Sequence, residues 1–147
     1  MGEGADLPGA VLFACSRNAA RSPMAASILK QLAGKRVYVD SAGVRACELD
    51  PFAEAVMAEI GIDLSGHVPK SLGELTDLSF DLIVTLSPEA HRRALALAAG
   101  HATEVEYWPT PNPSLAEGSR EQMLEAYRTL RDGLSARLKA RFPLTAP

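Results

Sequence analysis

One stretch decides the fold of this chain: Cys15-Ser16-Arg17-Asn18-Ala19-Ala20-Arg21-Ser22-Pro23. The apolar run over residues 11–14 directly before it is typical of a buried strand. Ser22 is a favourable N-cap and Pro23 a favourable first residue of a helix, so a helix is predicted from Pro23 to about Ala33. The pattern therefore predicts a strand, a tight loop and a helix, with Cys15 where the strand ends.

The rest of the chain continues this alternation. Strands are predicted over residues 10–14, 37–39, 80–86 and 103–107, and helices over residues 23–33, 51–60, 88–99 and 119–142. Residues 62–79 are expected to be irregular, with a short helix near 71–75. Alternating strands and helices favour a parallel sheet with right-handed crossovers. We therefore predict a three-layer α/β fold with a four-stranded parallel sheet and helices on both faces. The loops 15–21, 41–50 and 108–118 should then meet at one edge of the sheet.

Composition and charge predict a single domain without a nucleic-acid or membrane partner. The chain has 147 residues, 47% of them hydrophobic, and a net charge of −3, which does not indicate binding to nucleic acid or an anionic membrane. No apolar run is long enough to span a bilayer, and no basic segment followed by an apolar core opens the chain. We expect a disordered extension over residues 1–9, one domain over residues 10–147 and a cytoplasmic location.

The cysteines and histidines indicate neither a disulfide framework nor a metal site. Two cysteines are too few for such a framework in a chain of this length. The three histidines, His67, His91 and His101, lack the spacing of metal ligands, so they are interpreted as surface residues. We expect no metal, and nothing in the sequence implies a cofactor.

The loop from Cys15 to Arg21 has the chemistry of an anion site. Backbone amides ahead of a helix bind anions, and their field favours the thiolate form of Cys15. The Ser22 hydroxyl can donate to that thiolate, and the Arg21 guanidinium matches two phosphate oxygens. These features predict that Cys15 attacks a phosphorus atom. A bound phosphate, sulfate or arsenate would contact the intervening residues, Ser16, Arg17, Asn18, Ala19 and Ala20.

This motif, Cys-x5-Arg-Ser-Pro followed by Met-Ala-Ala, resembles the signature of the low-molecular-weight protein-tyrosine phosphatases, whose superfamily includes the thioredoxin-coupled arsenate reductases. Residues 61–67 and 80–86 are also similar to family segments, so the resemblance covers residues 10–142. It implies the strand order 2-1-3-4. It also implies hydrolysis of a phosphorylated protein or a small aryl phosphate through a phosphocysteine. A hydrogen bond between Asn18 and Ser41 would support the loop.

The general acid is the largest departure from the family pattern. The resemblance implies an Asp-Pro after the fourth strand, where this chain has Asn112-Pro113. An amide cannot protonate the leaving group, and loss of a general acid typically costs about 10²–10⁴ in rate. Three alternatives stay open at this point: a slow enzyme that relies on good leaving groups, recruitment of Glu117 as the acid, and a phosphate- or phosphopeptide-binding module without turnover.

Further departures concern thiols and the rim of the site. The arsenate reductases carry two relay cysteines after the third strand, and residues 85–91 contain none, which disfavours arsenate reduction by that route. Cys47 is interpreted either as a partner of oxidised Cys15 or as a partly buried thiol. Arg17 replaces a family glycine and either contacts the substrate or is solvated.

The aromatic residues that hold a phenol ring in the tyrosine-specific family members are also replaced. Ser114 and Leu115 stand at their positions after the Asn-Pro. Two aromatic residues precede this loop, Tyr107 and Trp108, which either line the site or pack against the end of the strand, and the second alternative is favoured.

Overall fold

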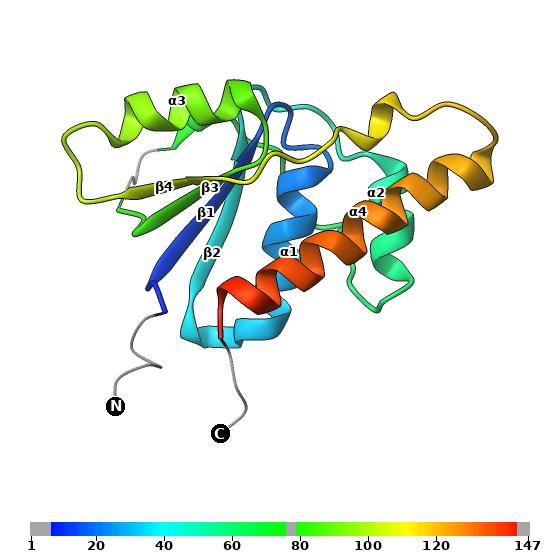
Figure 1. The fold of residues 1–147 in the computed structure, drawn as a ribbon, viewed down its shortest axis with the longest axis horizontal. Helices are drawn as coiled ribbons and strands as arrows, with labels where there is room; N and C mark the ends of the chain where they lie inside the picture. Colours follow the sequence, from blue (N-terminus) through cyan, green and yellow to red (C-terminus); the bar gives the residue numbers. More distant parts are fainter. Residues whose placement is uncertain (1–6, 76–78, 144–147) are drawn as a thin grey trace.

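The computed structural model describes residues 7–75 and 79–143 as an alternation of strands and helices (Figure 1). The strands are β1 (Ala10–Cys15), β2 (Tyr38–Gly43), β3 (Leu82–Thr85) and β4 (Glu104–Tyr107). The helices are α1 (Arg21–Ala33), α2 (Pro51–Ala58), α3 (Pro88–Ala98) and α4 (Arg120–Arg141). Short 3-10 helices are η2 (Gly34–Arg36), η3 (Leu72–Glu74) and η4 (Pro113–Leu115).

The sheet has the predicted topology. Its strands lie in the order β2-β1-β3-β4, and every neighbouring pair is parallel. Cys15 pairs with Gly43 at the last position of β1 and β2, and Ala14 pairs with Thr85 at the end of β3. The carboxyl ends of the strands therefore meet at one edge, where the loops that follow them begin.

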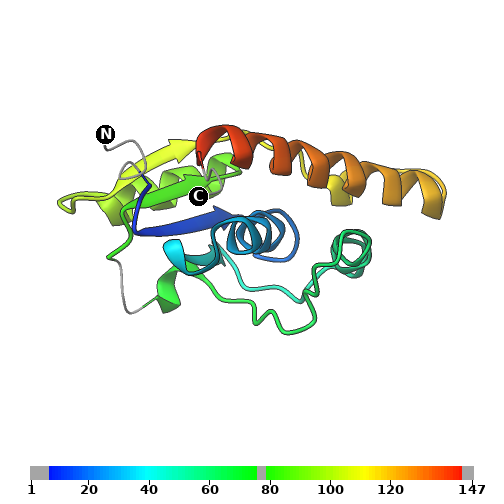
Figure 2. The same cartoon turned by 90° about the horizontal axis from the view of Figure 1, so that it is seen from below.

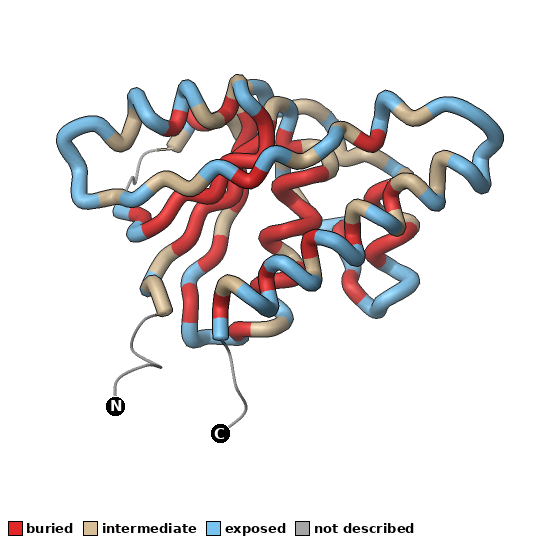
Figure 3. The backbone as a smooth tube through the Cα atoms, viewed as in Figure 1, coloured by how far each residue is buried: buried red, intermediate tan, exposed pale blue. Residues whose placement is uncertain are grey.

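Helices cover both faces of the sheet, as predicted. Alternate residues of β1 face opposite ways: Val11 and Phe13 pack in the core with α1 and α4, whereas Leu12 and Ala14 pack with α3. α4 crosses α1 and also packs against α2 (Figure 1 and Figure 2). The central strands and α1 are the most buried segments, whereas the loop between β4 and α4 is largely exposed (Figure 3). No helix of the described chain is long and apolar enough to cross a membrane.

Several element boundaries differ from the prediction. β2 continues to Gly43, because its backbone pairs along the whole length of β1. β3 is shorter than predicted and covers only Leu82–Thr85. The predicted short helix near residues 71–75 is η3, and residues 76–78 of the predicted irregular segment lie outside the described residues.

The ordered chain begins before β1. Residues 1–6 of the predicted disordered extension lie outside the described residues. Leu7 packs against the core, and the Gly9 carbonyl accepts a hydrogen bond of 2.9 Å from the backbone amide of Tyr38. The last three residues of that extension are thus held by β2 and the core.

A cluster of ion pairs joins α4 to the end of α2. The guanidinium of Arg128 lies 2.8 Å from the Glu59 carboxylate, and that of Arg131 also lies 2.8 Å from it. Arg131 donates to the Val56 carbonyl as well, so one buried side chain binds both the carboxylate and the backbone of α2. Hydrogen bonds from Arg128 and Arg131 lower the pKa of the Glu59 carboxyl from 4.5 to about 2.

The fold is therefore expected to lose stability in acid partly through Glu59. Because its pKa is lower in the folded state, the carboxylate stabilises the fold above about pH 4.5, and this contribution is lost as the pH falls toward about 2. Urea unfolding of the wild type and Glu59→Gln at several pH values checks this. The variant should be less stable at neutral pH, and the two curves should converge in acid. A constant difference across this range would contradict the assignment.

Candidate active site

The loop after β1 turns its backbone carbonyls outward. Each carbonyl from residue 15 to residue 19 accepts a hydrogen bond of 2.8–3.0 Å from a segment outside the loop. The donors are the backbone amides of Val44, Arg45, Cys47 and Asp50, and Nε2 of His67. In a trans peptide the amide that follows a carbonyl points the opposite way, and the described chain contains no cis bond. The amides of residues 16–20 therefore point into the loop.

Asn18 fixes the shape of this loop. Its φ of 56° is the left-handed conformation that asparagine tolerates, and its amide donates to Sγ of Cys15 at 3.2 Å. Its fully buried side chain donates from Nδ2 to Oγ of Ser41 at 3.0 Å and accepts at Oδ1 from the amide of Lys70 at 2.9 Å. The structure places the expected Asn18–Ser41 hydrogen bond here, and Lys70 is a partner that the sequence did not indicate.

His67 is half-buried against the loop, which corrects its interpretation as a surface residue. Burial lowers the pKa of His67 from its ordinary value of 6.5, so the neutral ring donates from Nε2 to the Asn18 carbonyl at 3.0 Å. His91 is also half-buried: its Nδ1 lies 3.0 Å from Oγ1 of Thr85, and its ring stacks on Tyr107. His101 is exposed, as predicted.

Gly43 allows the loop to approach β2 closely. A Cβ at this position would lie 2.6 Å from the amide nitrogen of Asn18 and 2.5 Å from the carbonyl oxygen of Arg45. Both are backbone atoms, which cannot move aside as the end of a flexible side chain can. The small size of Gly43 is therefore required by packing at the base of the loop.

Gly43→Ala is expected to displace the loop and weaken anion binding about tenfold to a hundredfold, because small misplacements of a preorganised site are costly. Sulfate titration by calorimetry measures this effect. Gly66→Ala is the matched control, since a Cβ there meets nothing within 4 Å and should leave sulfate affinity unchanged. Equal affinities for the two variants would show that the loop tolerates the added methyl group.

Ser22 serves the thiol rather than the helix, which corrects the predicted N-cap. α1 begins at Arg21, and the Ala20 N-cap provides no side-chain hydrogen bond. Oγ of Ser22 instead lies 2.9 Å from Sγ of Cys15 and accepts from Nδ2 of Asn18 at 2.9 Å. Because Asn18 occupies one lone pair of the hydroxyl, the Ser22 proton faces two acceptors, Sγ of Cys15 at 2.9 Å and the Ala42 carbonyl oxygen at 3.4 Å, and the shorter contact favours the sulfur. Ser22 and the amide of Asn18 thus place two donors beside the buried Sγ of Cys15.

Arg21 joins the anion loop to the segment after β4. Its Nη1 donates to the Thr110 carbonyl at 2.9 Å. Burial lowers the pKa of the Arg21 guanidinium from its ordinary value, while the nearby Cys15 opposes this shift. The arginine side chain is not deprotonated in proteins, so Arg21 places a largely buried cation beside the Cys15 thiol.

A small cavity brings several predicted site residues together. It has a volume of about 40 Å³ and is lined by Cys15, Arg17, Ala19, Ala20, Arg21, Asp50, Asn112 and Ser114. Arg17 is exposed at its rim, and Ser16 lies to one side, with its hydroxyl 2.9 Å from that of Ser87. The cavity is therefore an anion-sized recess with an arginine at its wall and an asparagine opposite.

Asp50 is a cavity residue that the sequence analysis missed. The Asp50-Pro51 pair was interpreted only as the start of a helix, and its carboxylate does accept from the amide of Phe52 at 2.8 Å. The other carboxylate oxygen accepts from the hydroxyl of Tyr127. Since both oxygens already accept hydrogen bonds, Asp50 is positioned as an acceptor rather than as a proton donor. No local sequence pattern indicated this role, because Tyr127 lies on a distant helix.

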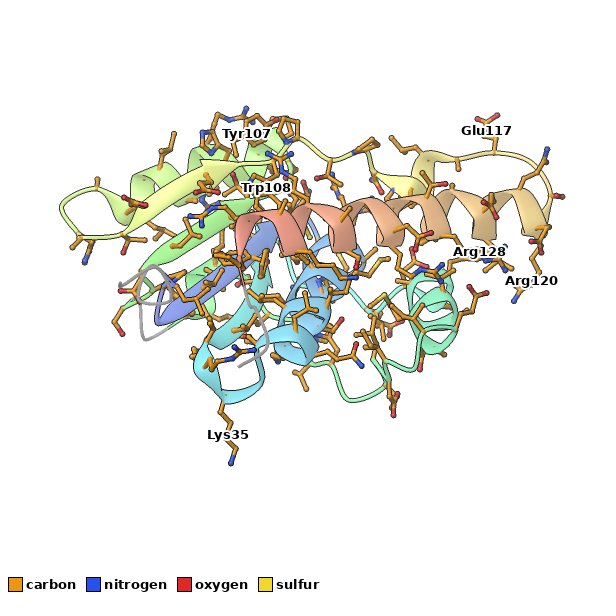
Figure 4. All side chains as sticks on the ribbon, turned by 60° about the horizontal axis from the view of Figure 1, so that its bottom comes forward. Lys35, Tyr107, Trp108, Glu117, Arg120 and Arg128 are labelled. Carbon is orange, nitrogen blue, oxygen red and sulfur yellow. The ribbon has the colours of Figure 1, made fainter. Side chains whose placement is uncertain are left out.

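Asn112 lines the cavity with a constrained side chain. Its Oδ1 accepts from the amide of Ser114 at 3.0 Å and from the hydroxyl of Ser114 at 2.8 Å. Glu117, the alternative acid, is exposed and does not line the cavity. Figure 4 shows its side chain extending away from the fold, near the start of α4. The structure therefore brings Asn112, and not Glu117, to Cys15.

The remaining residues singled out by the sequence lie around the site. Cys15 and Cys47 are both free thiols, and Cys47 is half-buried. Trp108 is buried and packs edge-on against Phe13, as predicted for packing at the strand end. Tyr107 is 36% exposed and stacks on His91, so it is only partly packed. No group of three metal-ligating side chains is assembled among residues 7–75 and 79–143.

Comparison with known proteins gives consistent matches. The family model described as low molecular weight phosphotyrosine protein phosphatase matches residues 10–139. An arsenate reductase of Bacillus subtilis (strain 168) is 33% identical over 129 residues, which cover 88% of this chain and 91% of that protein.

Solved structures have the same architecture. An arsenate reductase in the phosphate binding state matches with a TM-score of 0.71 and 26% identity, covering 93% of this chain and 98% of that chain. The tyrosine phosphatase Wzb from Escherichia coli K30, solved in complex with sulphate, matches with a TM-score of 0.74 and 21% identity, covering 92% and 99%. At that identity the second likeness concerns the fold alone.

Proposed function

The chain belongs to the low molecular weight phosphotyrosine protein phosphatase family, and we propose that it hydrolyses phosphomonoesters through a phosphocysteine at Cys15. The observation that carries this proposal is the loop whose five carbonyls are held outward while Sγ of Cys15 receives hydrogen bonds from inside. Inward amides and Arg21 supply the charge stabilisation that a transferring phosphoryl group requires. The proposed substrates are phosphotyrosine proteins or small aryl phosphates.

Catalysis would follow two displacements at phosphorus. The Cys15 thiolate forms the S–P bond while the bond from phosphorus to the leaving oxygen breaks, and the leaving group takes a proton from water. Water then attacks phosphorus, the S–P bond breaks, and phosphate leaves as the thiolate is regenerated. The hydroxyl of Ser22, 2.9 Å from Sγ, stabilises sulfur both as nucleophile and as leaving group.

The proposed selectivity follows from Asn112. Its amide has no acidic proton to give, and the Asp50 carboxylate in the same cavity already accepts two hydrogen bonds. The first displacement would then depend on the intrinsic stability of the leaving anion. We therefore propose a preference for aryl phosphates with acidic phenols over alkyl phosphates.

Trapping the intermediate tests this proposal. The wild type is mixed with p-nitrophenyl phosphate, quenched in acid during turnover, and digested for mass spectrometry. The expected result is release of phosphate together with one phosphoryl group on the peptide that contains Cys15. Binding of phosphate without either product would replace the phosphatase proposal by a phosphate-binding module.

Because the chain is similar to an arsenate reductase, the same experiment should also test arsenate as a substrate. The chain has only two cysteines, and Cys47 is not among the residues that line the small cavity. We therefore expect no reduction of arsenate in the presence of thioredoxin and its reductase. Arsenate should instead compete with p-nitrophenyl phosphate for the Cys15 loop. Thioredoxin-dependent formation of arsenite would overturn this expectation.

A further inference from the structure

A second, much larger cavity lies behind the segment that carries Asn112. Its volume is about 790 Å³, and it lies between the loop after β4 and α4. Most of its walls are apolar: the loop contributes Trp108, Pro111 and Leu115, and α4 contributes Leu130, Gly133 and Leu134. Leu115 is 76% exposed at the edge of this cavity, an unusual position for a large apolar side chain. A groove of this size and lining matches typical small-molecule sites.

The groove has a cation at one end. Arg137 lines it, and its guanidinium lies 4.6 Å from the centre of the Trp108 ring. Glu106 interacts electrostatically with Arg137, but its carboxylate already receives two nitrogens of Arg141 and the indole N–H of Trp108. Within residues 7–75 and 79–143, Arg137 forms no ion pair with a carboxylate. Apolar walls with one such cation are complementary to an amphiphilic anion.

We propose that this groove binds a free small molecule that has an apolar chain or ring and a single carboxylate, of the size of a medium-chain fatty acid. The apolar part lies against the prolines and leucines, and the carboxylate contacts Arg137. Burial of apolar surface supplies most of the affinity, and the exposed ion pair orients the ligand. The ligand is noncovalent and leaves the Cys15 loop open.

The groove shares a wall with the proposed catalytic cavity. Asn112 lines both cavities, and Thr110, which also lines the groove, accepts the hydrogen bond from Arg21. An occupant of the groove therefore contacts the same segment that holds Arg21 and Asn112. An effect of the groove ligand on the Cys15 site rests on the proposed function, whereas binding of the ligand to the groove does not. We expect ligand binding to change sulfate affinity at the Cys15 loop.

Trp108 provides a direct measurement, because it is the only tryptophan of the chain and lines the groove. Decanoate is titrated at concentrations at which it remains monomeric, and Trp108 fluorescence is recorded at several sulfate concentrations and constant ionic strength. The expected result is a saturable change whose Kd shifts with sulfate and then levels off, because the two sites are coupled. A Kd that rises in proportion to sulfate without levelling off would place decanoate in the Cys15 loop and overturn the proposal, as would the absence of saturable binding.

Two variants separate the apolar and the charged contributions. A Cβ at Gly133 meets nothing within 4 Å, so Gly133→Leu is expected to fill the groove and weaken decanoate binding at least tenfold. Ala136→Leu adds the same side chain at an exposed site of α4 outside the groove and should bind as the wild type does. Arg137→Gln should weaken decanoate roughly three- to fivefold and leave binding of neutral decanol unchanged. Unchanged decanoate binding in Gly133→Leu would refute the site, and equal losses for decanoate and decanol in Arg137→Gln would refute the role of the charge.

Discussion

Cys15→Ser is expected to lower phosphate release from p-nitrophenyl phosphate by roughly 10⁴–10⁶-fold, the scale on which enzymes lose rate when their nucleophile is removed. A serine hydroxyl is far less acidic than a thiol, so no comparable nucleophile forms at neutral pH. The two donors around the side chain, the Ser22 hydroxyl and the amide of Asn18, would still meet an oxygen. The variant should therefore lose turnover without losing the shape of the loop.

Sulfate binding by Cys15→Ser is the control for this prediction. The carbonyls of the loop are held by residues 44–50 and by His67, and none of these contacts involves the Cys15 side chain. Calorimetry should give a sulfate affinity within a few-fold of the wild-type value. If the variant bound sulfate normally and still released phosphate at the wild-type rate, Cys15 would not be the nucleophile.

Asn112→Asp should raise the rate on a phosphotyrosine peptide or phenyl phosphate by about 10²–10⁴-fold, the usual contribution of a general acid. An aspartate has the same shape, so one carboxyl oxygen can keep both hydrogen bonds from Ser114. The other oxygen is then available to carry a proton into the cavity that residue 112 shares with Cys15. Initial rates at several pH values measure the gain.

The leaving group provides the internal control for Asn112→Asp. Nitrophenolate needs little protonation, so the gain on p-nitrophenyl phosphate should be much smaller than the gain on phenyl phosphate. Asn112→Ala removes the side chain that caps η4 and should accelerate neither substrate. Equal gains on both esters would mean that the substitution acts on the loop rather than by proton transfer.

The sequence predicted what depends on local chemistry. The apolar run of β1 and the Cys-x5-Arg spacing indicated the strand and the anion loop, and the alternation of strands and helices along the chain indicated the parallel sheet. The helix predicted over residues 119–142 is α4, and it begins with a capping box in which Ser119 and Gln122 form both hydrogen bonds.

Contacts between distant segments could not be predicted in this way. Ser22 has the local preference of an N-cap, but its hydroxyl is taken by Cys15 and Asn18 once the loop has folded. The roles of His67 and Lys70 depend on a segment about 50 residues away that returns to Asn18, as their sequence separations of 49 and 52 indicate. Asp50 enters the cavity because α4 places Tyr127 against it. The residues that neighbour each of these positions in the sequence do not indicate which distant residue it contacts.

In the anion loop, residues 15–21, the groups that would bind the oxyanion differ from the side chains that would contact the rest of the ester. In the proposed mechanism the oxyanion is recognised by backbone amides, whose direction is set by residues 44–50 and 67 and not by the loop's own side chains at 17, 19 and 20. Those three side chains line the rim and can change while the phosphate cradle stays intact. Arg17, Ala19 and Ala20 are therefore the positions at which selection or design can alter which phosphate ester is accepted, without rebuilding the machinery that holds phosphorus.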